Sequence, residues 1–413
     1  MRKRHRLTIM VMLLAALLMV STTANAGSPV GSERFLIYND PGSTDEQEPA
    51  VAYNTQQNEY LVVWEGNGIW GQRIAASGGL MGSAFQISTG GYSPDVTYNS
   101  TANQYLVVWQ TDEDVVAQRL SDSGASVGSF IYVGVGDSSS GYYYDQPAVV
   151  YASTSDRYLF VYRYHQTSDG GSIIWAESYQ TNGTWDTSFT ITAYSTTEKP
   201  EHPDVAYNRS RNEFLIVWQK TVGSDVDVYA RLAKMTGGAG TQGSEFYIAA
   251  TGYDEIGPAV AAIPTAVNQG QYLVAWESDD GVDTDVGTRT VSWDGTAAAT
   301  YHFAAETGWS ENSPAVAGCE SNQEFLVTWT WVPVITPPAM LEVQAKTLDI
   351  NGVPLETLPV TVGGGQVFDS AVAAGSAGDF LVAFDDNETF ATYSRGIYGR
   401  LWGTRIYLPL VLR

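Results

Sequence analysis

The sequence predicts an all-β protein folded as a seven-bladed β-propeller with four-stranded antiparallel blades. The main observation is a phrase that occurs seven times: a short strand led by proline, a polar turn, and an apolar strand that ends in an aromatic residue. Successive copies end 45 to 58 residues apart, at Trp64, Trp109, Tyr162, Trp218, Trp276, Trp329 and Phe384. No segment shows a sustained helical period. Repeats of about 40–55 residues built only from strands are typical of propeller blades.

Each repeat contains four strand-like runs, which we label A to D in chain order. In the first repeat, strand A covers residues 49–53, strand B 60–64, strand C 69–74 and strand D 85–87. The small residues of strand A suit the crowded centre of a ring. Strand B is apolar almost throughout, as expected where adjacent blades cover both faces. We therefore expect the aromatic residue at its end to pack between blades, and the strand C arginines to pair with acids at blade edges.

The two ends of the chain predict how the ring closes. The seventh repeat supplies an A, a B and a C strand, the last at residues 397–401, but no D strand. A D-like run, residues 35–38, precedes the first A strand. Pairing this N-terminal strand with the last blade completes the blade and removes an exposed edge.

The N-terminus reads as a signal peptide spanning residues 1–26. Arg2, Lys3, Arg4 and Arg6 precede an apolar run, and small residues follow at 24–26. The run is shorter than the ~20 residues of a spanning helix, so we expect a secreted or cell-surface protein without a transmembrane segment. Residues 27–402 then form the propeller, and 403–413 a short apolar C-terminal tail.

Charge and cysteine content limit the partners. The chain carries 45 acidic and 21 basic residues, a formal net charge of −24, which disfavours nucleic acid and anionic lipid. The single cysteine, Cys319, excludes an internal disulfide. It lies in an A–B turn, where a catalytic thiol is not expected. We expect a monomer whose partner is a carbohydrate or an extracellular protein.

The repeat resembles the general family of secreted bacterial seven-bladed β-propellers over roughly residues 33–402. It lacks the Gly-His and Trp-Asp signature of WD40 repeats. Residues 182–185 only imperfectly resemble the Asp box of sialidases, because the aspartate is missing. The resemblance implies the fold and export, and names no specific activity.

The D–A and B–C connections emerge on one face of such a ring, and these variable loops are the expected place for binding. We call it the D–A/B–C face. Aromatic residues in the D–A loops could stack on sugar rings or fill gaps between blades. His202, before a strand A proline, could face the central opening. The candidate ligand-binding residues are Tyr92, Tyr143, His202, Tyr253 and Trp309.

Acidic residues gather in the B–C loops of the same face. Alternating carboxylates can supply oxygen ligands for Ca²⁺, whereas Asp is also common in solvated turns. The candidate metal ligands are Asp225, Asp227, Asp283 and Asp285. Ca²⁺ is the one cofactor this pattern suggests, and no EF-hand pattern is complete.

Three functions fit this sequence. The first is an exported, non-enzymatic binding or scaffold propeller that recognises a carbohydrate or protein through the D–A/B–C face; the regular repeats favour it over an enzyme. The alternatives are a hydrolase or lyase acting on a polysaccharide, with a carboxylate pair at the central channel, and a structural cell-surface spacer. The sequence singles out no catalytic residue, and fold alone does not decide function.

Overall fold

A computed structural model describes residues 28–29, 34–40, 45–235, 240–264, 269–305, 307–333, 341–356, 360–387 and 395–403. Within these ranges the chain is all-β, and no helix is long or apolar enough to cross a membrane. The predicted signal peptide lies outside the described residues, as does the predicted C-terminal tail beyond residue 403.

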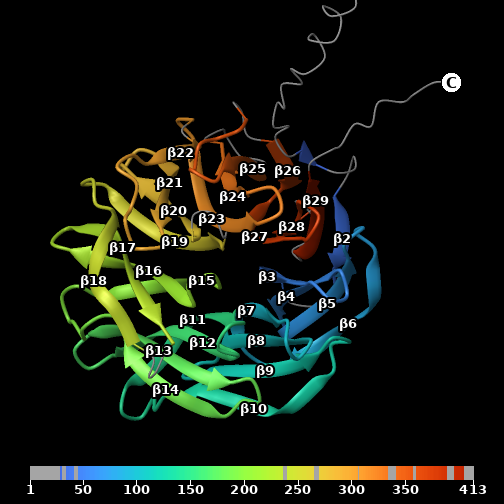
Figure 1. The fold of residues 1–413 in the computed structure, drawn as a ribbon, viewed down its shortest axis with the longest axis horizontal. Helices are drawn as coiled ribbons and strands as arrows, with labels where there is room; N and C mark the ends of the chain where they lie inside the picture. Colours follow the sequence, from blue (N-terminus) through green and yellow to red (C-terminus); the bar gives the residue numbers. More distant parts are fainter. Residues whose placement is uncertain are drawn as a thin grey trace, which may run out of the picture.

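Seven antiparallel sheets form the ring, as the repeat predicts (Figure 1). Blade 1 contains β3 (Gln47–Asn54), β4 (Glu59–Gly66), β5 (Gly68–Ala75) and β6 (Leu80–Ser88). Blade 2 contains β7 (Tyr92–Asn99), β8 (Gln104–Gln110), β9 (Val115–Ser121) and β10 (Ser126–Gly134). Blade 3 contains β11 (Tyr142–Ala152), β12 (Arg157–Gln166), β13 (Ser172–Gln180) and β14 (Trp185–Thr190). Blade 4 contains β15 (Pro200–Asn208), β16 (Glu213–Val222), β17 (Asp225–Lys234) and β18 (Gly240–Ala249).

The remaining blades follow the same order. Blade 5 contains β19 (Asp254–Ile263), β20 (Gln271–Asp279), β21 (Thr284–Ser292) and β22 (His302–Ala305). Blade 6 contains β23 (Ser310–Cys319), β24 (Glu324–Val332), β25 (Leu341–Asp349) and β26 (Val360–Gly365). Blade 7 contains β27 (Val367–Ala374), β28 (Asp379–Asp386) and β29 (Gly396–Gly403), joined by β1 (Ser28–Pro29) and β2 (Phe35–Tyr38).

The N-terminal strand closes the ring, which confirms the prediction. β2 pairs antiparallel with β29, with Phe35 opposite Gly399 and Tyr38 opposite Ile397. β1 extends the same edge and pairs with residues 402–403. Tyr38 also packs against the first blade, because its ring lies 5.3 Å from that of Trp64. The closing strand therefore ties blade 7 to blade 1.

The A strands surround the central axis, and the D strands form the outer wall (Figure 1). Neighbouring A strands contact one another all the way round, from β3 through β27 and back to β3. The aromatic residues at the ends of the B strands are buried between blades, as predicted. The indoles of Trp64, Trp218 and Trp329 are 0% exposed. Stability therefore comes from packing repeated at each blade junction.

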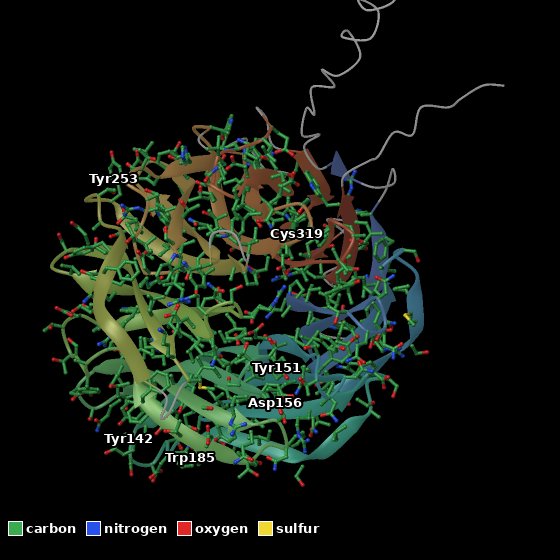
Figure 2. All side chains as sticks on the ribbon, viewed as in Figure 1. Tyr142, Tyr151, Asp156, Trp185, Tyr253 and Cys319 are labelled. Carbon is green, nitrogen blue, oxygen red and sulfur yellow. The ribbon has the colours of Figure 1, made fainter. Side chains whose placement is uncertain are left out.

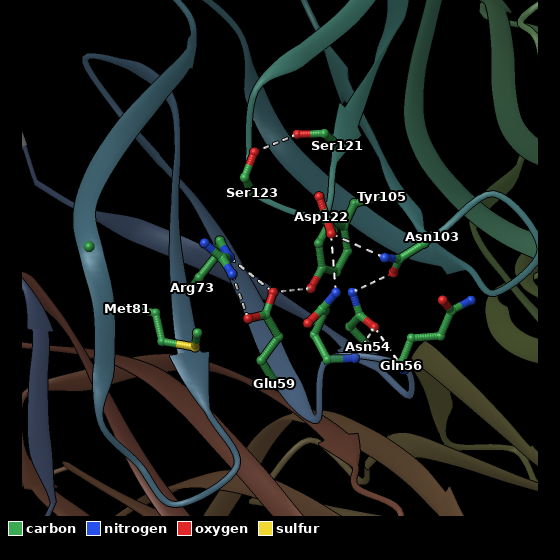
Figure 3. A network of polar contacts seen from close by, with 12 residues as sticks. Asn54, Gln56, Glu59, Arg73, Met81, Asn103, Tyr105, Ser121, Asp122 and Ser123 are labelled. Carbon is green, nitrogen blue, oxygen red and sulfur yellow. Dashed lines mark hydrogen bonds and ion pairs between the residues drawn. The ribbon is translucent and has the colours of Figure 1, made fainter.

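A polar network joins blades 1 and 2 at the A–B turns (Figure 3). The Arg73 guanidinium donates two hydrogen bonds to the Glu59 carboxylate, at 2.8 and 2.9 Å. Glu59 also accepts a hydrogen bond from the Tyr105 hydroxyl of blade 2 at 3.0 Å. This strand C arginine pairs with an acid as predicted, whereas Arg231 donates to the backbone carbonyls of Ile191 and Gly243 instead.

Candidate functional site

Every A strand carries a β-bulge close to its start, at the end of the channel where the D–A loops arrive. In blade 1, for example, Gln47 pairs with Glu65 and Ala50 with Val63, so that two residues oppose Trp64 alone. The bulged residue before the strand A proline in blades 1 to 6, with its counterpart in blade 7, forms what we call the mouth ring. Its members are Glu48, Ser93, Gln146, His202, Gly257, Ser313 and Asp369.

The backbone of the mouth ring is unusual. Its first six members have positive φ angles between 49° and 58°. Residues before proline normally adopt extended conformations, and a left-handed conformation costs a non-glycine residue about 1–3 kcal/mol. Gly257 adopts this conformation with little strain, whereas Glu48 (φ 50°) and His202 (φ 49°) adopt it at that energetic cost. Bulges of this kind re-aim side chains and are common beside active sites.

In several blades a side chain at the end of the preceding blade's B strand accepts a hydrogen bond from the N–H of the bulged residue. The Gln146 N–H donates to Oε1 of Gln110 at 2.6 Å, and the Ser313 N–H donates to Oε1 of Glu277 at 2.8 Å. Each acceptor directly follows the buried aromatic residue of its own strand. A buried N–H without a partner is costly, so these polar residues fix the ring backbone.

Glu48 and Asp369 occupy the same mouth-ring position in the neighbouring blades 1 and 7, and the charge of Glu48 acts on Asp369. Burial, reinforced by the charges of Asp385 and Glu48, raises the pKa of Asp369 to about 6, although Ser313 hydrogen bonds to the same carboxyl group. Burial and the charge of Glu48 also raise the pKa of Glu65. This part of the mouth ring therefore holds a carboxyl group that stays protonated at mildly acidic pH beside a second acid.

An ion pair positions Asp369 from behind. The fully buried Asp385 side chain accepts hydrogen bonds from the N–H groups of Phe368 and Asp369, at 3.1 and 2.8 Å. Asp385 is held in turn by Nη1 of Arg395 at 2.9 Å. The same guanidinium lies 4.2 Å from the centre of the Phe368 ring. Asp385, held by Arg395, thus fixes the backbone at Phe368 and Asp369.

The mouth ring has a different character at blades 3 and 4. Arg163 forms ion pairs with Asp145, at 2.6 Å, and with Glu201 of the next blade. The backbone N–H of His202 donates a 2.8 Å hydrogen bond to Oε1 of Gln146, and its Nε2 lies 3.4 Å from Nε2 of Gln146. Burial lowers the pKa of His202. A neutral imidazole and an amide therefore stand in the ring with the acid pair of blades 7 and 1.

Two further carboxylates directly follow the strand A proline in blades 2 and 4. Asp95 accepts hydrogen bonds from the N–H groups of Val96 and Val149, both at 2.7 Å. Asp204 accepts equivalent bonds from Val205 and Val260, also at 2.7 Å. Burial raises the pKa of Asp95 to about 6 and that of Asp204 to about 7. Each side chain bridges its blade to the next one, which is first a structural role.

The structure places the five predicted ligand-binding residues in different blades. His202 lies in the mouth ring, as the sequence suggested. Tyr92 lines a pocket between blades 1 and 2, and Tyr143 stacks on His165 at 5.3 Å. Tyr253 is 51% exposed and lies toward the outside of the ring (Figure 2). Trp309 packs edge-on against Trp331. A ligand role for these residues stays a prediction.

The predicted metal ligands form two separate pairs. Asp225 and Asp227 lie in blade 4, where Asp227 is buried opposite Lys220. Asp283 and Asp285 lie in the B–C region of blade 5, and their charges act on Glu311 of blade 6. Among the described residues no group of three or more His, Cys, Asp or Glu side chains is arranged to hold a metal ion. Calcium binding stays an untested prediction.

Sequence reasoning missed Glu48 and Asp369. Both lie at one repeat position, the residue before the strand A proline or its counterpart Ser370. This position is polar or glycine in all seven repeats although it opens a strand that is otherwise small and apolar. Aligning the seven repeats on this position would have identified the residues of the mouth ring.

Comparison with known proteins gives structural similarity only. No protein-family model matches the chain, and no curated protein matches it in sequence. The α-L-arabinofuranosidase Arb93A of Fusarium graminearum is 14% identical, with a TM-score of 0.48 over 78% of this chain and 99% of its own. Raptor of Chaetomium thermophilum is 10% identical, with a TM-score of 0.51 over 92% of this chain and 29% of its own. An endo-arabinase of Bacteroides thetaiotaomicron is 11% identical, with a TM-score of 0.39 over 63% and 94%.

These comparisons agree with the propeller fold, and at such identities they establish no more than the fold. They nevertheless correct the first functional prediction, a non-enzymatic binding or scaffold propeller. Several of the similar structures are carbohydrate-active enzymes, namely arabinofuranosidases and an endo-arabinase. The regular repeats misled that prediction, because they hide a mouth ring whose side chains vary from blade to blade.

Proposed function

We propose that the protein hydrolyses glycosidic bonds of a neutral polysaccharide at the mouth ring. The observation that carries this proposal is the pair formed by Glu48 and Asp369, one of which has a pKa raised to about 6. Glycoside hydrolysis generally uses two carboxyl groups: a protonated one that donates to the leaving oxygen, and an ionised one that activates water or attacks the sugar. Asp369 fits the first role, and Glu48 is the second carboxyl group of the mouth ring at the same junction.

The roles follow from the surroundings of each acid. Asp369 is the general acid, since burial and the neighbouring charges of Asp385 and Glu48 favour its protonated form. Glu48 is the second carboxylate. Gln146 and His202 belong to the same ring and provide amide and imidazole groups that can hydrogen bond to sugar hydroxyls. Asp385 acts as a positioning residue through the backbone of Asp369.

Charge favours a neutral substrate. A chain with a formal net charge of −24 repels polyuronates, which carry a carboxylate on each sugar. Two arginines close to the mouth ring are already paired, Arg395 with Asp385 and Asp45, and Arg163 with Asp145 and Glu201. A polysaccharide lyase would need a free cation to neutralise a uronate carboxylate. We therefore propose a hydrolase rather than a lyase, acting outside the cell after export by the N-terminal leader.

The test is reducing-end release from arabinan, galactan, xylan and β-glucan, with polygalacturonate as the acidic comparison. The wild-type protein should cleave at least one neutral polymer and leave polygalacturonate intact. Glu48→Gln and Asp369→Asn should each lower the rate at least ~10³-fold, because each removes one half of the acid pair. Asp280→Asn, an exposed loop acid, is the matched control and should keep full activity. Cleavage that survives both mouth-ring substitutions would disprove the assignment.

A further inference from the structure

Pockets recur at equivalent places over three consecutive blades. Each is bounded by the D-strand end or D–A loop of the preceding blade and by strands A, B and C of its own blade, and strand D also lines the pockets over blades 2 and 4. Their volumes are about 470 Å³ over blade 2, 390 Å³ over blade 3 and 310 Å³ over blade 4. The starts of A strands and the ends of B strands lie at the mouth-ring end of each blade. The three pockets therefore belong to the D–A/B–C face, outside the ring.

Aromatic rings form most of the pocket over blade 3. Tyr144 and Tyr164 lie opposite each other on β11 and β12, with ring centres 5.2 Å apart. Tyr162 and Trp175, which pair across β12 and β13, complete the aromatic wall. On the blade 2 side, a Cβ on Gly134 would lie only 2.7 Å from the Tyr144 ring. Glycine is therefore needed there for the two blades to fit together.

One carboxyl group lies among these rings. Glu177 lines the pocket and accepts a 3.0 Å hydrogen bond from the Tyr179 hydroxyl at Oε2, with a further hydrogen bond from Tyr162. Burial raises the pKa of Glu177. The pocket thus combines flat aromatic walls with a carboxyl group whose position is fixed by hydrogen bonds.

We propose that the pockets over blades 2 and 3 are accessory subsites, each holding one sugar unit of a neutral polysaccharide. A sugar ring offers an apolar C–H face that stacks on an aromatic ring and hydroxyl groups that bond to a carboxyl oxygen. Volumes of 390 and 470 Å³ are in the usual range for small-ligand sites. This class of ligand rests on the proposed function, since a polysaccharide hydrolase must hold its polymer beyond the scissile bond.

The pocket over blade 2 repeats the pattern with different residues. Tyr92, Trp109, Phe130 and Tyr132 supply its rings, and Trp109 packs edge-on against Phe130 at 5.6 Å. Its acids include Asp112, which lies 3.3 Å from the Tyr92 hydroxyl. Tyr92 is one of the ligand-binding residues predicted from the sequence, and it lines this pocket.

The pocket over blade 4 differs, which makes it a natural comparison. Lys220 lies in it and forms ion pairs with Glu198 at 3.2 Å and Glu245 at 2.6 Å. No aromatic residue lines this pocket. Ion pairs there satisfy the polar groups that a sugar would have to reach, so we do not assign a sugar subsite to blade 4.

The position of the blade 3 pocket relative to the mouth ring suits one polymer chain. Tyr144 precedes the ring residue Gln146 by two positions on β11, about 7 Å at the usual rise per strand residue. Because successive side chains of a strand point to opposite faces, the aromatic pocket and the ion pair beside the mouth ring lie on opposite faces of blade 3. Tyr144 and Tyr164 line the pocket, whereas the intervening pair, Asp145 and Arg163, turns toward Glu201 of blade 4. A bound chain would thus pass from the aromatic pocket to the mouth ring at Gln146 across one end of blade 3, and the acid pair of blades 7 and 1 lies further round the same ring.

The test is affinity electrophoresis in gels that contain arabinan, galactan, xylan or β-glucan, with the Asp369→Asn protein as parent so that no polymer is cleaved. The parent should be retarded by at least one polymer. Adding Tyr164→Ala and Tyr132→Ala should weaken binding at least 10-fold, because each change removes a stacking surface. Tyr164→Phe keeps the ring and should bind within twofold of the parent. Tyr247→Ala, an equally exposed tyrosine on β18, is the matched control.

Two results would overturn the proposal: unchanged retardation of the protein that carries Tyr164→Ala and Tyr132→Ala, or no retardation of the parent by any of the polymers. If Tyr164→Ala does not fold, Tyr132→Ala alone decides, since this side chain is 57% exposed. If the wild-type protein cleaves no polymer but binds one, and this binding needs the tyrosine rings, the subsites are supported and the hydrolase is refuted. If it cleaves a polymer but binding does not need the tyrosine rings, the hydrolase is supported and the subsites are refuted.

Discussion

Deleting residues 27–40 is expected to open the ring and to leave little soluble folded protein. The deletion removes β2, which is the fourth strand of blade 7. It exposes the core at the junction of blades 7 and 1, where Ile37 packs with Trp64 and Leu381. It also removes the Tyr38 ring, which lies 5.8 Å from Trp70. Blade 7 would then have an unpaired edge on β29.

Single substitutions in β2 give a graded version of the same prediction. Ile37 is 4% exposed and its neighbour Leu36 is 49% exposed, because alternate residues of a strand face opposite sides. Ile37→Ala should lower the free energy of unfolding by about 2–4 kcal/mol, whereas Leu36→Ala should lower it by less than about 1 kcal/mol. Urea denaturation followed by tryptophan fluorescence measures both. Equal losses for the two variants would show that β2 does not close the ring.

The second large effect concerns pH. The fold buries glutamates three residues before the strand A proline in blades 1, 5 and 6: Glu46, Glu255 and Glu311 are at most 1% exposed. Burial raises the pKa of each to about 7. An unfolded glutamate titrates near 4.3, so between about pH 4 and pH 7 the folded protein holds more protons than the unfolded chain. Stability must therefore be highest at the acidic end of this window and fall as the pH rises through it.

The measurement is the melting temperature from pH 5 to pH 8, which should fall by roughly 5 °C or more. Glu311→Gln separates this cause from general charge repulsion, because it replaces the carboxyl group with a neutral group of the same shape. At pH 8 it should stabilise the protein by about 2 kcal/mol, since the wild-type carboxyl is then ionised while buried. At pH 5 its effect should be small. A melting temperature that rises with pH would contradict the assignment of these groups.

Most of the fold could be predicted because its determinants are local and repeated. The apolar run ending in Trp64 and its copies fixed the B strands, and the missing last D strand, supplied by residues 35–38, fixed the closure. These signals need no knowledge of distant contacts. The family resemblance agreed with them on the fold.

The candidate site could not be predicted in the same way. Glu48 and Asp369 lie 321 positions apart in the chain and meet only because the ring closes. The bulges that expose the mouth ring depend on strand register and on positive φ angles. Neither can be predicted from the residue type before each proline. The sequence analysis instead selected loop residues such as Tyr253 and Trp309, because variable loops usually carry function. It identified His202 by its place before a proline, and that reasoning extended to the other repeats would have reached the acid pair.

The most direct measurement of the central claim compares Asp369→Asn with wild type on two substrates of the sugar that the wild type releases. One is an unactivated oligosaccharide, and the other is an aryl glycoside whose leaving group needs no proton. If Asp369 is the general acid, the substitution lowers the rate on the oligosaccharide at least ~10³-fold but has far less effect on the aryl glycoside. The decline of the wild-type rate above about pH 6 should disappear in the variant. Equal losses on both substrates, or no loss on either, would contradict an acid role for Asp369 and with it the proposed site.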